Sequence, residues 1–263
     1  MEKMSDIIPW LRKLETTYFG RTIEVLTQTE STNSVAMALG LNNAPAGTLI
    51  IADTQSKGRG RLGKSWYSEA GTGLYFSLVL RPSLPLVDLP KITLAAGVGV
   101  CQAIEEQTNL FPGLKWPNDL LLAGRKFGGI LTETGPCRSA RPLVILGIGI
   151  NVLTPQAAFP ENLQQKATSL LTHSSKEVCR GKLLSSILVR LEKIFTLLEQ
   201  GGFQEILAAW KVRDAYRDAN ITCLTPEGRV ISGISLGPDE HGVLHIRDDE
   251  GKIHEVFSGD ISL

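Results

Sequence analysis

The stretch that decides the fold of this 263-residue chain is GTLIIADTQSKGRGRLGKSWYSEAGTGLYFSLVL, residues 47–80. Its two ends, 47–55 and 73–80, are dominated by apolar residues, which predicts two buried β-strands. The residues between them, 56–72, are rich in glycine and basic side chains, which is typical of a loop. We therefore expect a basic loop that connects two buried strands.

The densest part of this loop is Lys57–Lys64, which contains four cations, three glycines and no acid. Glycines let backbone amides converge on an anion, and arginine binds phosphate or carboxylate through two parallel hydrogen bonds. The segment therefore indicates a phosphate site. A solvated basic loop is an equally good interpretation of these residues alone.

Two short patterns match known motifs but stand in the wrong context. Residues 58–65 fit the phosphate-loop pattern G-x-x-x-x-G-K-[ST], yet a strand pattern follows where that motif requires a helix. Residues 233–237 fit the hydrolase pattern G-x-S-x-G, but only turns and strands are predicted after them. We therefore expect neither a P-loop nor a nucleophilic role for Ser235.

Outward from the loop, helical and strand patterns alternate until about residue 220, after which only strands are predicted. Helices are expected over 7–17, 31–39, 88–108, 183–198 and 203–213. Further strands are expected over 22–29, 114–116, 119–122, 127–133, 143–153, 221–224, 230–236, 243–247 and 253–257. The pattern predicts an α/β domain over 1–217, with a mixed central sheet flanked by helices, and a small β-barrel domain over 218–263.

Charge and composition exclude several classes of protein. The 27 basic and 27 acidic residues cancel, which argues against a general nucleic-acid or membrane-surface binder. The cancellation hides an asymmetry, because residues 217–263 hold four basic and nine acidic residues (−5) and residues 1–216 carry the balance of +5. The sequence shows no apolar run of membrane-spanning length and no signal peptide, so we expect a cytoplasmic protein.

The cysteines do not indicate a metal or redox site. Cys101, Cys137, Cys179 and Cys223 are separated by 36, 42 and 44 positions, and no C-x-x-C pair occurs. We therefore expect reduced structural thiols.

Two further features point to ligand contact. Lys115 stands between apolar residues in a strand pattern, so its charge should meet an anion; an exposed lysine on an edge strand is the alternative. Glycines recur in the strands around 128–129 and 147–149, which favours close approach of a ligand or of another backbone. Bulges or crossing strands explain any single glycine equally well.

In this order and spacing, six segments resemble the biotin protein ligases. They are Glu30–Asn33, Ala52–Arg61, Gly73–Leu78, Lys115–Asp119, Gly128–Leu131 and Gly147–Asn151. The resemblance runs from about residue 22 to the end of the chain. It implies a catalytic domain related to those of class II synthetases and lipoate ligases.

The resemblance also implies the reaction: biotin and ATP form biotinyl-5′-AMP and pyrophosphate, and biotin then passes to one lysine of the biotin carboxyl carrier protein of acetyl-CoA carboxylase. Mg²⁺ would assist, with ligands that the sequence does not name. Catalytic roles are implied for Lys115, Arg59 and Arg61. Biotin contacts are implied for Ser31, Thr32, Asn33, Gln55, Arg59, Gly60, Arg61, Lys115, Gly129, Gly147 and Gly149. ATP contacts are implied for Gly58, Arg59, Arg61, Trp66, Lys115, Asn118 and Asn151.

The chain departs from the family pattern in several places. Leu62 stands where many members have arginine, and Ser68-Glu69 replaces a Ser-Pro pair. About 20 residues precede the first predicted strand, too few for a winged helix-turn-helix, so we expect no DNA binding and no repressor activity. A homodimer is common in the family, and the sequence offers no independent sign of one. A lipoate-protein ligase is the alternative enzyme; a non-catalytic biotin sensor or a P-loop nucleotide-binding module are the alternatives from other classes.

Overall fold

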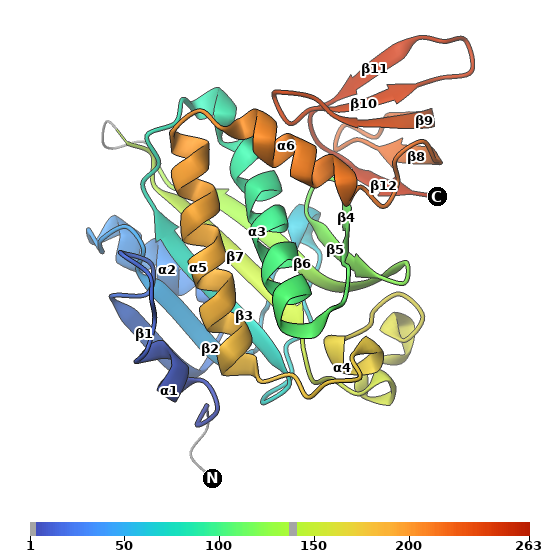
Figure 1. Ribbon diagram of the computed structural model, residues 1–263. Coiled ribbons are helices and arrows are strands. Elements are labelled where there is room, and N and C mark those ends of the chain that lie inside the picture. Colours follow the sequence, from blue (N-terminus) through green and yellow to red (C-terminus); the bar gives the residue numbers. More distant parts are fainter. Residues whose placement is uncertain (1–3, 137–140) are drawn as a thin grey trace.

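The computed structural model describes residues 4–136 and 141–263, and its centre is a seven-stranded mixed sheet (Figure 1). From edge to edge the strands are β1 (Ile23–Thr29), β2 (Leu49–Gln55), β3 (Gly73–Leu80), β7 (Val144–Asn151), β6 (Arg125–Thr134), β5 (Asp119–Leu122) and β4 (Gly113–Lys115). The two strands predicted from residues 47–80 are therefore β2 and β3, antiparallel neighbours inside the sheet.

Helices cover both faces of this sheet. The helices are α1 (Ile8–Leu11), α2 (Thr32–Leu41), α3 (Pro90–Thr108), α4 (Leu170–His173), α5 (Arg180–Glu199) and α6 (Phe203–Val212). Figure 1 shows α3, α5 and α6 on one face and α2 behind the sheet. The mixed α/β fold expected from the sequence is thus confirmed.

Alternation along the central strands explains the two layers. Leu49 and Ile51 of β2 belong to the large core beneath α3 and α5, whereas Ile50 packs with Ala36 of α2 on the opposite face. Successive side chains of a strand point to opposite faces, so a strand buried on both sides carries an apolar run. In β7 the glycines 147 and 149 share the α2 face with Ile145. The α2 face of β7 therefore carries no side chain at these two positions, which lets other groups approach the sheet closely.

Strand connections follow the turn chemistry of the sequence. β1 and β2 are parallel and are joined through α2, while the remaining neighbours are antiparallel. The β5–β6 hairpin turns at Ala123 and Gly124, with φ of 46° and 74°. Two successive residues of positive φ match the twist of a two-residue hairpin, as expected at this turn.

After α6 the chain forms a five-stranded antiparallel sheet. Its strands are, from edge to edge, β11 (Ile253–Val256), β10 (Leu244–Arg247), β9 (Val230–Pro238), β8 (Asn220–Leu224) and β12 (Asp260–Ser262). The indole of Trp116 donates to Gly242 O at 3.0 Å, which ties this sheet to the central one. Ser235 is buried in β9, so its place is structural, as expected.

The helix predicted over 7–17 is much shorter than expected. Only Ile8–Leu11 is helical. The Glu192 carboxylate of α5 accepts the backbone N–H groups of residues 17–19 at 2.6 to 2.9 Å. These bonds hold the chain in a turn that a continued helix would not allow.

Helix α3 combines length with apolar character. An 18-residue window within Leu86–Thr108 has a mean hydropathy of 1.3, which by length and composition would suffice to cross a membrane, and 67% of that window is buried inside the protein. The helix lies on the sheet and packs against α5 and α6 on the same face, which accounts for its composition (Figure 1). Cys101 of this helix, Cys179 and Cys223 are free thiols in the described part of the chain, and Cys137 lies outside the described residues.

Candidate active site

A cavity of about 650 Å³ lies on the α2 face of the central sheet. Glycine-bearing β6 and β7 contribute to its floor, and the basic loop and the C-terminal end of the chain contribute to its walls. The lining contains these predicted residues: Ser31, Thr32, Asn33, Gln55, Arg59, Gly60, Arg61, Trp66, Lys115, Asn118, Gly129, Gly147, Gly149 and Asn151. Segments scattered over the sequence thus meet at one site.

One end of the cavity is polar and buried. Gln55 Oε1, at the end of β2, accepts Thr32 N at 2.8 Å and Thr32 Oγ1 at 3.2 Å. Its amide nitrogen donates to Ser68 Oγ at 3.1 Å. Ser31, Thr32 and Asn33 begin α2, so their positions are set by the helix start. This polar end presents neutral donors and acceptors in a fixed arrangement.

Ser77 belongs to the polar end, and the sequence analysis did not single it out. It is fully buried in β3, and its hydroxyl donates to Asn33 Oδ1 at 2.6 Å or to Thr32 Oγ1 at 2.8 Å. A serine in a strand of otherwise apolar residues was the signal that could have identified it. Burial of a hydroxyl is costly without such partners.

Glycines of the floor make room for side chains of the protein itself. A Cβ at Gly149 would lie 2.6 Å from the Trp66 ring, and one at Gly129 would lie 3.4 Å from it. A Cβ at Gly147 would collide with the Asn33 amide. The buried Trp66 Nε1 has no hydrogen-bond partner among the described residues. Trp66 therefore rests on the floor with an unused donor.

The opposite end of the cavity is a cationic wall made of Arg61, Lys64, Lys115 and Lys126. Arg61 donates to Ser258 Oγ at 2.9 Å, and to Asn118 Oδ1 and Gly259 O at 3.4 Å each. Burial lowers the pKa of the Arg61 guanidinium, and nearby acids oppose this shift. The C-terminal sheet thus helps to hold the basic loop in place.

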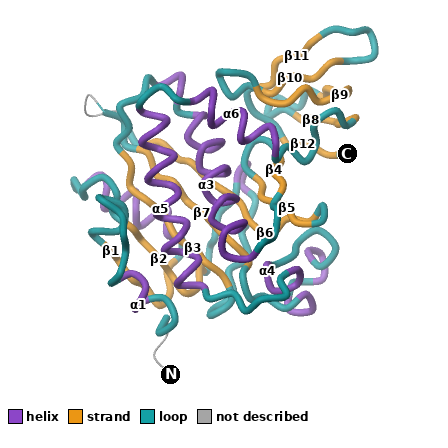
Figure 2. The backbone as a smooth tube through the Cα atoms, in the orientation of Figure 1, coloured by secondary structure: helices purple, strands orange, loops and turns teal. Residues whose placement is uncertain are grey.

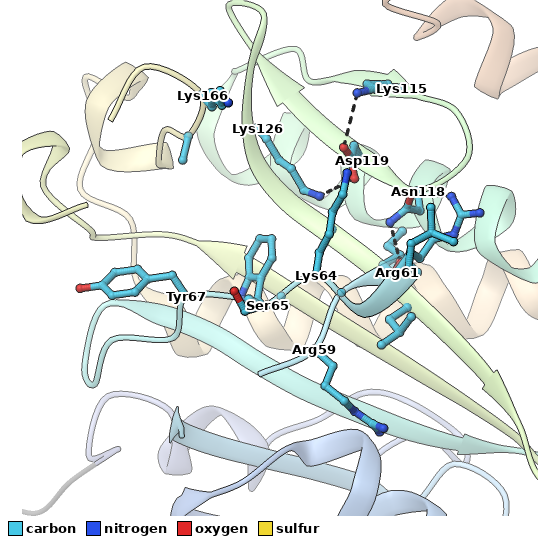
Figure 3. A pocket seen from close by; sticks show the side chains of 18 of the residues that line it. Arg59, Arg61, Lys64, Ser65, Tyr67, Lys115, Asn118, Asp119, Lys126 and Lys166 are labelled. Atoms are coloured by element: carbon cyan, nitrogen blue, oxygen red, sulfur yellow. Dashed lines mark hydrogen bonds and ion pairs between the residues drawn. The ribbon is translucent and has the colours of Figure 1, made fainter. Parts of the chain in front are cut away.

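Lys115 of β4 has the negative partner that its strand position predicted. Its Nζ lies 4.0 Å from Asp119, which also binds Lys126 Nζ at 2.5 Å (Figure 3). Burial lowers the pKa of Lys115, and the charges of Asp119 and Asp260 act in the other direction. A partly desolvated cation of this kind interacts strongly with an incoming anion.

Lys64 completes the cationic wall. Its Nζ lies 2.5 Å from Asp260, and the hydrogen bond from Lys64 with the charges of Lys64, Lys115 and Lys126 leaves the pKa of Asp260 below its usual value. Burial by itself would raise that pKa, so the lysines more than offset it. Each lysine of the wall therefore has an acidic neighbour that an anionic ligand must displace or tolerate.

Two lysines of the cavity lining, Lys126 and Lys166, were not predicted from the sequence. Lys126 lies over the Trp66 ring, 5.6 Å from its centroid, and Lys166 lines the cavity from the segment that joins β7 to α5. That segment is mostly loop with short helical turns (Figure 2). The composition of that segment carries no ligand motif, whereas Lys126 lies in β6, directly before the predicted glycine-bearing strand over 127–133.

Gly58 lies outside the cavity lining, contrary to its predicted contact with ATP. A Cβ there would lie 2.6 Å from Trp66 O, and Gly58 O accepts the Trp66 N–H at 2.8 Å. The residue therefore shapes the loop backbone. Asn151 does line the cavity, and its amide donates to Thr168 O at 3.1 Å.

The side chains of the site limit how a metal ion could bind there. The described residues hold no group of three or more His, Cys, Asp or Glu side chains placed to bind one. The carboxylates in the lining are Asp119 and Asp260, each beside lysines. Mg²⁺ usually binds through one or two carboxylates and the phosphates of a substrate, and the site fits only that mode.

Comparison with known proteins places the chain in a family. Residues 25–151 match the Biotin/lipoate A/B protein ligase family, and residues 220–263 match the Biotin protein ligase C terminal domain. The Bifunctional ligase/repressor BirA of Bacillus subtilis is 40% identical over 89% of this chain and 71% of its own length. The Biotin--[acetyl-CoA-carboxylase] ligase of Mycobacterium tuberculosis is 33% identical over 92% and 88%.

A solved structure gives the same result for the fold. The biotin protein ligase of Aquifex aeolicus, determined in complex with biotin and ATP, is 33% identical and superimposes with a TM-score of 0.80. The match covers 92% of this chain and 98% of that one. Sequence, domain content and fold agree: this chain belongs to the biotin protein ligase family.

Proposed function

We propose that the protein is an ATP-dependent biotin protein ligase. One observation carries this function: a single cavity joins a buried pocket of neutral donors and acceptors to a wall of cations. Biotin has a polar ureido ring at one end and a carboxylate at the other, and ATP adds phosphates. The polar end therefore matches the ureido ring of biotin, and the cationic wall matches the biotin carboxylate and the phosphates of ATP.

In the first step a biotin carboxylate oxygen attacks the α-phosphorus of ATP, and pyrophosphate leaves. The polar end, Ser31 to Asn33 with Gln55, would hold the ureido ring. Arg59 and Arg61 would orient the carboxylate and the phosphates, and Lys115 would stabilise the charge that grows on the α-phosphate. Mg²⁺, bound through the phosphates, would offset further negative charge.

In the second step the amine of a carrier lysine attacks the acyl carbon of biotinyl-5′-AMP, and AMP leaves. The nucleophiles of both steps come from substrates. This explains why the protein needs no nucleophilic residue of its own, in agreement with the structural place of Ser235. Catalysis rests on orientation and electrostatics.

The polar end also favours biotin over lipoate. The ring of lipoate is an apolar dithiolane, which would pack against the polar groups of Thr32, Asn33 and Gln55 without hydrogen bonding to them. The ureido ring of biotin can donate to and accept from such groups. The named ligase relatives support the same choice.

Incubation with biotin, ATP, Mg²⁺ and a biotin carboxyl carrier domain tests the proposal, with the mass of the carrier as readout. We expect one biotinyl group on a single lysine and release of pyrophosphate. Lipoate replaces biotin in a parallel reaction. Labelling by lipoate alone would favour the alternative ligase, and biotin binding without labelling would favour a sensor.

Several expectations stay predictions. These are the division of the chain at residues 217 and 218, the acetyl-CoA carboxylase carrier as partner, the cytoplasmic location, the absence of DNA binding and the homodimer. Size-exclusion chromatography with light scattering tests the dimer. A titration with promoter DNA of biotin-synthesis genes tests DNA binding.

A further inference from the structure

Glu133 lies near the end of β6, beside the polar end of the cavity, and no role has been assigned to it above. Along β6 it shares a face with Gly129 and Leu131, both of which line the cavity. Its Oε2 accepts two bonds, from Asn33 Nδ2 at 2.7 Å and from Arg59 at 3.0 Å. One carboxylate oxygen thus joins the buried pocket to the basic loop.

These bonds continue a longer chain of contacts. Asn33 Oδ1 accepts from Ser77, whose hydroxyl also lies 2.8 Å from Thr32 Oγ1. Thr32 donates to Gln55. Glu133 is therefore the link through which the loop cation Arg59 meets the network of the polar end.

The Arg59 side chain points away from the cationic wall. Figure 3 shows Arg59 pointing away from Lys64, Lys115 and Asp119, toward the opposite side of the loop. Its ion pair with Glu133 is 46% exposed on the arginine side and 30% on the glutamate side. Ion pairs with this exposure are weak and exchange readily with other anions.

We propose that Glu133 is a positioning residue that holds Arg59 aside until the carboxylate of the ligand replaces it. This inference rests on the proposed function, because it takes biotin as the ligand and Arg59 as its carboxylate contact. Glu133 then sets biotin affinity through competition for one guanidinium. Biotinol, which carries a hydroxyl in place of the carboxylate, does not enter that competition.

The test is calorimetric titration of Glu133→Gln with biotin and with biotinol. The glutamine keeps an oxygen that accepts from Asn33, so the polar end and biotinol affinity should be unchanged. Biotin should bind about threefold more tightly, the range of a partly exposed ion pair. The ratio of the two affinities is a readout that a merely structural role would not move.

Two further variants sharpen the test. Glu30→Gln removes the Lys57–Glu30 ion pair of the same loop, which is more exposed, and should leave both affinities unchanged. In an Arg59→Met background, Glu133→Gln should no longer change biotin affinity. Weaker or unchanged biotin binding by Glu133→Gln would overturn the inference while the proposed function stands. A wild-type chain that binds no biotin would overturn both.

Discussion

The two ends of the cavity are built on different physical principles. At the polar end, Thr32, Asn33 and Ser77 are at most 4% exposed and are joined by neutral hydrogen bonds. At the cationic wall, Lys64 is 61% exposed and Lys126 is 36% exposed, and each pairs with an acid. Buried hydrogen bonds are costly to break, whereas exposed ion pairs are not. The polar end is therefore a rigid site that can select a ligand by its hydrogen bonds. The cationic wall can exchange its own acidic partners for the charged groups of a ligand.

The sharpest test of the cationic wall is Lys115→Ala. Unlike Lys64, Lys115 is only 16% exposed, so its charge should act on the phosphates with little screening. We expect biotin-dependent pyrophosphate release to fall by about 10²- to 10³-fold, the scale for loss of one transition-state contact. Circular dichroism should show an unchanged fold.

Lys57→Ala is the matched control for this variant. Lys57 lies on the same loop, is 71% exposed and pairs with Glu30. Its removal should leave turnover nearly unchanged. Near-normal turnover of Lys115→Ala would show that Lys115 has no part in the mechanism. It would also show that the shielded Lys115 acts no differently from the exposed lysines.

At the polar end, Ser77→Ala should reduce both stability and biotin affinity. The substitution leaves buried groups of Thr32 and Asn33 without the serine hydroxyl, and we expect a loss of about 1–3 kcal/mol in the free energy of unfolding. Urea denaturation measures it. Ser83→Ala, at an exposed serine, is the control; equal effects of the two variants would show that burial of the network has no special role.

Asp214 offers a third case, a partly buried acid that forms no ion pair in the described part of the chain. Its Oδ1 accepts Tyr216 N at 3.0 Å, and its buried Oδ2 has no partner among the residues described. Burial raises the pKa of Asp214 to about 6. The folded state therefore holds this proton more tightly than the unfolded state, and stability from this group falls as the pH rises from about 4 to above 6.

Asp214→Asn should remove that dependence. We expect the variant to gain about 2 kcal/mol in the free energy of unfolding at pH 7.5 relative to wild type, and little at pH 4. Denaturation of both proteins at the two pH values measures the difference. The same gain at both would show that titration of Asp214 is not its cause.

The smallest effect is expected for Lys64→Ala. The Lys64 side chain is 61% exposed and that of Asp260 is 48% exposed, so the free energy of unfolding should change by less than about 1 kcal/mol. The KM for ATP should rise by less than about fivefold. Asp260→Asn should match it in stability, and a loss as large as that of Lys115→Ala would contradict the description of the wall as exchangeable.

Local patterns predicted much of the fold. The apolar runs of β2 and β3 and the stripe of α5 need only strand or helix periodicity and a buried neighbour. The helix expected over 7–17 ends already at Leu11, and Glu192, far away in sequence, binds the backbone N–H groups of residues 17–19. Short elements of this kind depend on tertiary contacts more than on their own pattern.

The residues of the site also fall into those that local motifs predicted and those that depend on tertiary contacts. Ser31, Gln55 and Lys115 stand in motifs with a recognisable order, and all three line the cavity. Ser77 stands in the segment Gly73–Leu78 but had no predicted role, and Ser258 reaches Arg61 across 197 positions of sequence. Such contacts depend on how the central sheet and the C-terminal sheet pack together. The spacing of residues along the chain does not predict that packing.

This long-range docking has a consequence for the order of folding. Contacts of the basic loop with residues 258–260 join segments 196 to 198 positions apart, and such closures form late because they cost chain entropy. Residues 31–133, which build the polar end, also leave the ribosome earlier. Pulsed hydrogen exchange during refolding, with β3 and β12 followed separately, measures this order. We expect a nascent chain to form the polar end before residues 258–260 fix its basic loop.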